Sequence, residues 1–460
     1  MDRAARRSPR TGAPRTHSSA PDRGRRDFLR TSTLAALAAL GSRASALGAA
    51  DPMRQAPLEP ANLLPGRIVL LREPEMDGHL ETIDEARVAS VVHQGVRVLA
   101  NKLTTASAFE SLFPGLTSTS KIAIKVNCIG PCDTRWETVR GIVSGLAQML
   151  SSTYDVSQVT IFDRDLSDHG YTADRFTFNG RTAALRADIN PGSYYPYGSY
   201  RLSSYILNAD HLIDVPVLKS HSDTNNQITV ALKNHYGSCF PSSLCGNIPG
   251  MLTVNADQHI KGKTRLVITD AIRGTYNGGP GEPAQNWNTF PEQKPNTLFF
   301  ATDPVTNEYW ARDMINDERQ SRGWSTKPCP WIEQASGAPY NLGVSNPAQM
   351  TVISMNAADV PGETETQTGT TFLAPSVPNP FRERTSIRFR MGHGGLAAVA
   401  IYDVSGRLVR DLGERSYGEG YATVPWDGRD ADGRAVAAGV YLARLSTDSG
   451  TRSRRLVRSR

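Results

Sequence analysis

Between residues 67 and 315, apolar runs of five to seven residues recur along the chain of 460 residues, separated by longer stretches. Each run is short, rich in Val, Ile and Leu, and bounded by polar residues, which predicts a buried strand. Apolar positions between Asp84 and Lys102 recur every three or four residues, as in an amphipathic helix. The expected strands cover residues 67–71, 121–126, 158–162, 212–218, 264–269 and 297–301, and further helices are expected at residues 136–150 and 304–315.

This alternation of strands and helices predicts an α/β fold with a largely parallel sheet and flanking helices. Polar residues follow five of the predicted strands. In open α/β sheets, ligands bind outside the carboxyl ends of the strands, so these residues predict a binding site along one rim. The alternative is that Asp and Asn cap the following helices and turns, which we expect for Asp303, directly before Pro304. The residues at the strand ends are Asn127, Asp163, Lys219 with His221, Asp270 and Asp303.

The stretch from Ala209 to Gly237 contains the densest group of candidate functional side chains. One apolar run ends in Lys219 and His221, and a second ends in Lys233 and His235. Charge is costly at the edge of a buried segment unless it is paired or used, so these pairs are candidates for function. The alternative is that they are surface or hydrogen-bonded core residues. The catalytic candidates are Lys219, His221, Lys233, His235 and Asp270, and the cofactor-binding candidates are Asn127, Asp163, Lys233 and Asn234.

The histidines and cysteines give a candidate metal site. The five cysteines do not have zinc-ribbon spacing, and four of them form two local pairs that could hold an iron–sulfur cluster if both loops met. Disulfides or free thiols explain the same pairs, so the cofactor, whether a metal ion or a cluster, stays open. The candidate ligands are His221, His235, His259, Cys128, Cys132, Cys239 and Cys245.

The pattern changes after residue 371. Pro361 to Thr370 is polar and low in apolar residues, as expected of a linker. Short alternating runs follow, separated by turn signals such as Ser405-Gly406 and Asp427-Gly428. About 90 residues of this pattern predict a small all-β, immunoglobulin-like sandwich. Its strands are expected at residues 387–390, 397–403, 408–412, 421–426 and 440–445.

The N-terminal segment changes how the charge is interpreted. The formal net charge is +6, but residues 1–46 hold ten Arg and three Asp with no Lys or Glu, which leaves about −1 for the rest. A nucleic-acid partner is therefore not expected. Arg25-Arg26-Asp27-Phe28-Leu29-Arg30 precedes a short apolar run and resembles a twin-arginine export signal. The resemblance implies the twin-arginine export machinery as a partner and a periplasmic, cell-surface or secreted location, without a transmembrane anchor.

Three sequence stretches carry a family resemblance. IAIKVN at 122–127, ADHLIDVPVLKSH at 209–221 and ITVALKNHYG at 228–237 resemble the family called domain of unknown function 362, over about residues 65–320. A distant likeness to the nickel-pincer lactate racemase family lies in Cys132-Asp133-Thr134-Arg135 with the later His221 and Lys233. In that family such a Lys tethers the cofactor, and His residues bind metal or move protons.

The C-terminal segment resembles a second family. Pro378-Asn379-Pro380-Phe381, IYDVSGRLVR at 401–410 and WDGRDADGRAVAAGVYLARL at 426–445 are similar to the immunoglobulin-like domain of flagellar hook-capping proteins and to type IX sorting domains. The resemblance implies contact with a cell surface or a secretion apparatus.

The sequence thus predicts five segments: a signal at 1–46, a linker at 47–66, an α/β domain at 67–345, a linker at 346–371 and a β-sandwich at 372–460. Two function classes remain open. The first is an exported enzyme of an uncharacterised family that uses a metal or redox cofactor on a small anionic substrate. The second is a non-catalytic extracytoplasmic ligand-binding or cell-surface protein.

Overall fold

The computed structural model describes residues 63–77, 82–221, 227–360, 371–374, 376 and 379–459. The predicted signal peptide, nearly all of the linker at 47–66, and Pro361 to Thr370 lie outside these residues. No helix in the described ranges is long and apolar enough to cross a membrane.

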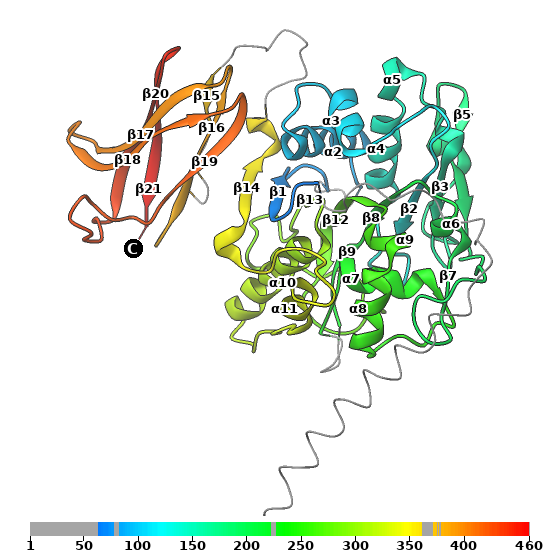
Figure 1. The fold of residues 1–460 in the computed structure, drawn as a ribbon. Helices are drawn as coiled ribbons and strands as arrows, with labels where there is room; N and C mark the ends of the chain where they lie inside the picture. Colours follow the sequence, from blue (N-terminus) through cyan, green and yellow to red (C-terminus); the bar gives the residue numbers. More distant parts are fainter. Residues whose placement is uncertain are drawn as a thin grey trace, which may run out of the picture. The chain divides into compact units, whose positions relative to one another are not determined.

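A ten-stranded mixed sheet organises the chain from residue 67 to residue 356 (Figure 1). Most of its strand pairs are parallel, which confirms the predicted fold class. Strand β13 is antiparallel to both of its neighbours, β1 and β12. The order along the sheet is β14 (Thr351–Asn356), β1 (Arg67–Arg72), β13 (Thr297–Ala301), β12 (Thr264–Thr275), β8 (His211–Val215), β2 (Ile122–Val126), β3 (Val159–Phe162) and β6 (Ala184–Arg186), while β9 (Val217–Ser220) pairs with β12 and with β10 (Ile228–Thr229).

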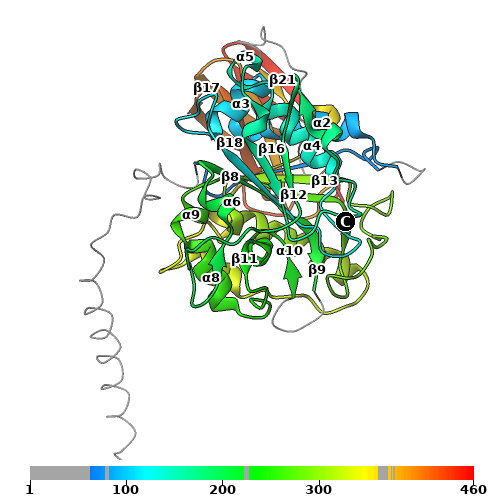
Figure 2. The ribbon, with the colours of Figure 1, turned by 90° about the vertical axis from the view of Figure 1, so that its right-hand side faces the viewer.

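Helices cover both faces of this sheet (Figures 1 and 2). Side chains alternate along each strand, so Val69 and Leu71 join one apolar core while Ile68 and Leu70 join the other. On the first face lie α2 (Glu85–Ala100), α3 (Thr105–Leu112) and α4 (Trp136–Leu146), and on the second lie α7 (Ala231–Asn234), α8 (Ile248–Ala256), α10 (Pro304–Ser321) and α11 (Trp331–Ser336).

The predicted strands are all present, with three differences. The run at 212–218 is split into β8 and β9 at Pro216, which has no N–H to donate and whose carbonyl accepts from the Asp270 N–H at 2.8 Å. Strand β12 continues to Thr275 rather than ending at Thr269. The second apolar run of the Ala209–Gly237 stretch is a short strand, β10, followed by a single helical turn, α7.

The expectation that five strand ends share one rim is wrong for Asp303. Because β13 is antiparallel to its neighbours, its carboxyl end lies at the opposite edge of the sheet. Asp303 instead caps α10, accepting from the N–H groups of Val305 and Thr306 at 2.9 and 3.0 Å. This confirms its predicted capping role.

Smaller elements complete this part of the chain. The segment at 170–198 holds the short hairpin of β4 and β5 and the edge strand β6. The remaining elements are β4 (Thr177–Phe178), β5 (Arg181–Thr182), β7 (Arg201–Leu202), β11 (Cys239–Phe240), α5 (Met149–Ser152), α6 (Ser204–Leu207), α9 (Gln258–Lys261), and 3₁₀ turns at Val156–Gln158, Ala173–Phe176, His235–Ser238, Pro347–Gln349 and Ala357–Asp359.

The C-terminal part is all β, as predicted. Two antiparallel sheets share one apolar core that includes Ile387, Val399 and Trp426. Strand β21 was not predicted, because four of the nine residues of its sequence GTRSRRLVR are arginines and it lies at the sheet edge. The sheets are β15 (Phe372–Leu373), β16 (Thr385–Met391) and β19 (Gly420–Trp426), and β18 (Leu408–Tyr417), β17 (Gly395–Asp403), β20 (Gly439–Thr447) and β21 (Gly450–Arg458).

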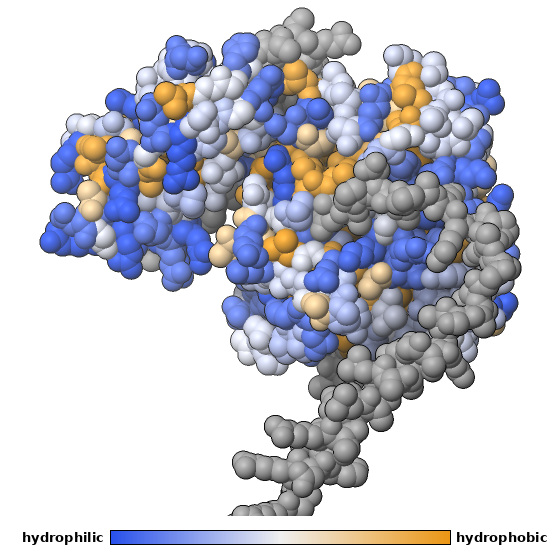
Figure 3. All heavy atoms as spheres, in the orientation of Figure 1, coloured by the Kyte–Doolittle hydropathy of each residue, from blue (hydrophilic) through white to orange (hydrophobic). Residues whose placement is uncertain are grey.

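Polar residues predominate on the face drawn in Figure 3, and apolar residues form separate patches between them. Single exposed apolar residues are ordinary on a folded protein. One of them, Ile129, lines the pocket described below.

Candidate functional site

A pocket of about 150 Å³ lies at the carboxyl ends of β2, β3 and β9, and residues of α7 and the following turn close it. It brings together seven of the predicted site residues from five separate segments. These are Asn127, Asp163, Lys219, His221, Lys233, Asn234 and Cys245.

A buried ion pair lies beside the pocket. The Lys125 Nζ donates to the Asp163 Oδ1 at 2.9 Å and to the Asn234 Oδ1 at 3.2 Å. Both charged side chains are almost fully buried. Lys125 was missed by the sequence analysis, although a lysine within the apolar run IAIKV was the available signal.

Asp163 also fixes the backbone around the pocket. Its Oδ2 accepts from the Cys128 N–H at 2.7 Å, and its Oδ1 accepts from the Arg164 N–H at 2.8 Å. The carboxylate therefore holds the loop that leaves β2 against the end of β3. Its role in this structure is to pair Lys125 and to position two backbone segments.

Lys219 is held by neighbouring acceptors. Its Nζ donates to the Asn127 Oδ1 at 3.0 Å and to the Ile129 carbonyl at 2.7 Å. Asn127 in turn donates from its Nδ2 to the Asn234 Oδ1 at 3.2 Å. Burial lowers the pKa of the Lys219 ammonium, since the charged form loses its hydration.

Gly237 lets the turn after α7 approach the ion pair. A Cβ at this position would lie 2.8 Å from both the Lys125 Nζ and the Asp163 Oδ1. Only glycine therefore fits without displacing the pair. The Lys233 Nζ lies 5.7 Å from the centre of the Tyr236 ring, and both residues line the pocket.

The charges around the pocket are unequal. The cationic side chains that line it are Lys125, Arg164, Lys219 and Lys233, against the single carboxylate of Asp163. Even with the pKa of Lys219 lowered, cationic groups outnumber the carboxylate. A cavity lined mainly by one sign of charge concentrates ligands of the opposite sign, so this pocket favours anions.

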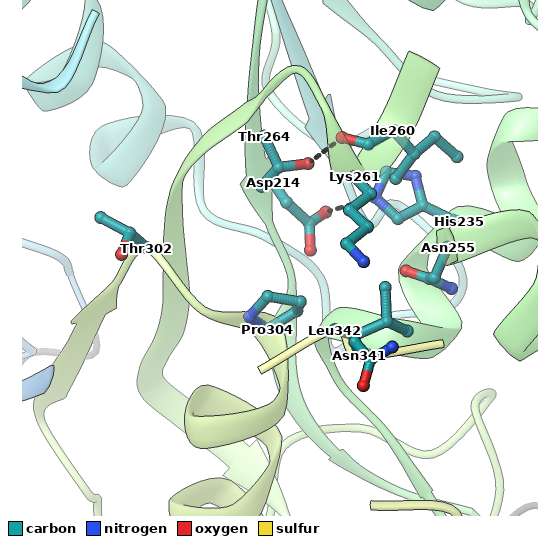
Figure 4. Close-up of a pocket in the computed structure, with 10 residues that line it drawn as sticks. All are labelled: Asp214, His235, Asn255, Ile260, Lys261, Thr264, Thr302, Pro304, Asn341 and Leu342. Carbon is teal, nitrogen blue, oxygen red and sulfur yellow. Dashed lines mark hydrogen bonds and ion pairs between the residues drawn. The ribbon is translucent and has the colours of Figure 1, made fainter. Parts of the chain in front are cut away.

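His235 lines a different pocket, of about 70 Å³, together with Asp214 (Figure 4). The two side chains face each other, with the His235 Nε2 4.0 Å from the Asp214 Oδ1. The Asp214 Oδ1 accepts from the Asn234 Nδ2 at 2.7 Å, so Asn234 lies between the two pockets. The sequence analysis missed Asp214, although an aspartate inside the apolar run LIDV was a signal.

Burial favours the neutral form of both groups in this second pocket. It raises the pKa of Asp214 to about 8 and lowers the pKa of His235 to about 3. The nearby Asn234 amide and the charge of Lys125 favour the ionised form of Asp214 but do not outweigh burial.

Asp270 does not line the anion-favouring pocket. Its Oδ2 accepts from the Arg135 N–H at 2.9 Å and from the Thr138 Oγ1 at 2.8 Å, and its Oδ1 accepts from the Ile272 N–H at 3.1 Å. Helix α4 has no side-chain cap of its own. Asp270 therefore supplies acceptors to the start of that helix from strand β12.

The seven predicted metal ligands do not gather at one place, since only His221 and Cys245 line the anion-favouring pocket. His259 packs against Tyr194, with ring centres 4.8 Å apart, and Cys245 is the one predicted cysteine ligand that lines the pocket. All five cysteines are free thiols, and burial raises the pKa of Cys132 to about 11 and of Cys239 to about 12. Among the residues that the structure describes, no group of three or more His, Cys, Asp or Glu side chains could hold a metal ion.

The part of the chain that holds the site is an open, mostly parallel α/β fold with a cationic pocket at its carboxyl rim. Residues 122–313 of this part match the family model described as Domain of unknown function (DUF362). A second family model, FlgD Ig-like domain, matches residues 395–451. The likeness to lactate racemases is not shown by these matches and stays a prediction. No curated protein matches the chain.

Several solved structures are similar to part of the chain. PorU from Porphyromonas gingivalis is 25% identical over 19% of this chain and 9% of its own, with a TM-score of 0.17. PorZ, a surface component of the type IX secretion system of the same organism, is 28% identical over 19% and 11%, with a TM-score of 0.15. FlgD from Xanthomonas campestris is 24% identical over 20% and 68%, with a TM-score of 0.15. The chain thus spans about a tenth of the length of PorU and of PorZ.

The neutral state of Asp214 gives a prediction for stability. Its pKa is raised from an ordinary 3.8 to about 8, so the folded state holds this proton more tightly than the unfolded state does. The contribution of Asp214 to stability is therefore complete below about pH 4 and declines as the pH rises towards 8. Asp214→Asn keeps an acceptor for Asn234 and carries no titrating proton. Between pH 5 and pH 8, we expect the free energy of unfolding of the variant to rise by ~1 kcal/mol or more relative to that of the natural chain.

The measurement is the free energy of unfolding in urea of both proteins at several pH values. The difference between the two proteins isolates Asp214 from the other groups that titrate in this range. A difference that stays constant from pH 5 to pH 8 would show that Asp214 is ionised in the folded protein.

Proposed function

We propose that the pocket at the carboxyl ends of β2, β3 and β9 binds a small anion, and that the chain is an exported enzyme acting on it. The observation that carries the proposal is the excess of cationic side chains around one pocket, where Lys125, Arg164, Lys219 and Lys233 face the single carboxylate of Asp163. A pocket lining in which cationic side chains outnumber carboxylates raises the affinity for an anionic ligand.

The size of the pocket limits the ligand. A water molecule takes about 30 Å³ of liquid volume, so a pocket of about 150 Å³ holds a group of a few heavy atoms. A phosphate or a short carboxylate fits this description. The Asn127 Nδ2 has a second N–H besides the one that it donates to Asn234, and this group can bond a carboxylate or phosphate oxygen.

Two side chains of the pocket can take part in proton transfer. His221 follows β9 and lines the pocket, and an imidazole can accept or donate a proton near neutral pH. Lys233 comes from α7 and supplies the second group. The predicted metal ligands do not gather at this pocket, so the proposed chemistry assigns no step to a metal or to an iron–sulfur cluster.

The second candidate is a non-catalytic extracytoplasmic binding protein. It is favoured by the bonding of the lysines, since the ammonium groups of Lys125 and Lys219 are already fixed by acceptors of the protein. Such groups provide charge and position without being activated as nucleophiles.

NMR of a mixture of phosphate esters and short carboxylates separates the two candidates. The enzyme converts one of them and His221→Asn does not, whereas a binding protein returns the anion that it binds unchanged.

The location belongs to the proposal as well. Export is supported by the paired arginines in the N-terminal segment, and the match of residues 395–451 to the FlgD Ig-like domain fits a role at a cell surface or secretion apparatus.

We expect Arg25→Lys together with Arg26→Lys to leave the chain in the cytoplasm, because the twin-arginine signal needs both guanidinium groups. Cell fractionation and immunoblotting measure this. The matched control is Arg23→Lys, which should not change export, and equal export of all three proteins would contradict the proposal.

Anion binding is tested with inorganic phosphate and acetate by isothermal titration calorimetry. We expect Lys233→Gln to weaken binding about tenfold or more, because it removes a buried charge that lines the pocket. Lys261→Gln is the matched control, since Lys261 lines the other pocket and donates to the Tyr340 carbonyl at 2.9 Å. Binding should also weaken as salt rises.

Two outcomes would count against anion binding at this pocket. One is that the natural chain binds neither phosphate nor acetate. The other is that Lys261→Gln lowers the affinity as much as Lys233→Gln does, which would mean that the ligand is held elsewhere.

A further inference from the structure

An exposed apolar side chain lies where the cationic pocket opens. Ile129 follows β2 and is 46% exposed, although it is a large aliphatic residue, and it lines the pocket together with Pro280. The cationic side chains of Lys125, Lys219 and Lys233 are almost fully buried. The pocket therefore has a charged inner end and an apolar wall nearer to solvent.

The residue that carries the apolar wall is also bonded to one of the lysines through its backbone. The Lys219 Nζ donates to the carbonyl of Ile129 itself at 2.7 Å. An anion that approaches Lys219 consequently has its next atoms beside the Ile129 side chain. A similar pair lies across the pocket, where the Lys233 Nζ is 5.7 Å from the centre of the Tyr236 ring.

The wall is held in place by its backbone. Gly130 has a φ of +73°, and a Cβ there would lie 2.3 Å from the Pro280 carbonyl oxygen. The loop that carries Ile129 is thus packed directly onto the loop that carries Pro280. A preformed apolar surface of this kind loses little entropy when a ligand covers it.

We propose that the ligand is an organic anion, a carboxylate or a phosphate ester, whose apolar chain or ring lies on Ile129, Pro280 and Tyr236 while its charged end faces the lysines. This inference rests on the proposed anion-binding function and narrows its ligand class. An inorganic ion would leave the Ile129 wall in water, whereas each methylene that covers it is removed from water.

The test is a series of straight-chain carboxylates, from acetate through propanoate and butanoate to pentanoate, titrated calorimetrically into the full chain. Each added methylene that reaches the wall should tighten binding about threefold to fourfold. Ile129→Ser should flatten the rise in affinity along this series, and a urea unfolding transition like that of the natural chain shows that the variant is folded. Val404→Ser is the matched control, since Val404 is 73% exposed and does not line the pocket.

The outcomes separate this inference from the function on which it rests. If acetate binds but affinity does not rise along the series, the ligand-class inference is wrong and anion binding stands. If affinity rises equally in the natural chain and in Ile129→Ser, the apolar contact lies elsewhere and the inference is again wrong. If no carboxylate or phosphate binds, the proposed function itself fails.

Discussion

The site depends on the buried ion pair of Lys125 and Asp163. Lys125 lies in β2, Asp163 directly follows the neighbouring parallel strand β3, and both side chains are almost fully buried. Removing one partner of such a pair leaves an uncompensated charge, at a cost of roughly 3–5 kcal/mol. The Asp163 carboxylate also accepts hydrogen bonds from the backbone N–H groups of Cys128 and Arg164. Gly237 has no side chain and so leaves room for the pair. The pocket thus depends on an ion pair, and loss of either partner would destabilise the fold.

Asn234 extends the same network to a second cavity. Its Oδ1 accepts from Lys125 and Asn127, while its Nδ2 donates to Asp214. One amide therefore connects the cationic pocket with the neutral Asp214 and His235 behind it. This arrangement orients the amide, because its reversal would place donors against the donors of Lys125 and Asn127.

Much of the fold could be predicted from the sequence, since short apolar runs between amphipathic helices define a parallel α/β sheet. Asn127, Asp163, Lys219 and His221, predicted from their places at strand ends, do line one pocket, whereas Asp270, predicted in the same way, does not. The direction of β13 could not be predicted, because an apolar run carries no signal of parallel or antiparallel pairing, so Asp303 was placed at the wrong edge. Lys125 and Asp214 were missed because each lies inside an apolar run, where a charged residue was treated as part of a strand. His235 faces the other pocket because residues two apart on a helical turn point about 200° apart.

The central claim is that this rim pocket holds an anion, and crystallography with a heavy anion tests it most directly. Crystals of the folded chain soaked in selenate, and measured at the selenium absorption edge, locate the ion by its anomalous signal. The account predicts a peak inside the pocket, within hydrogen-bond reach of the Lys233 or Lys219 ammonium. Peaks found only on surface arginines, with no selenate in the pocket, would contradict it.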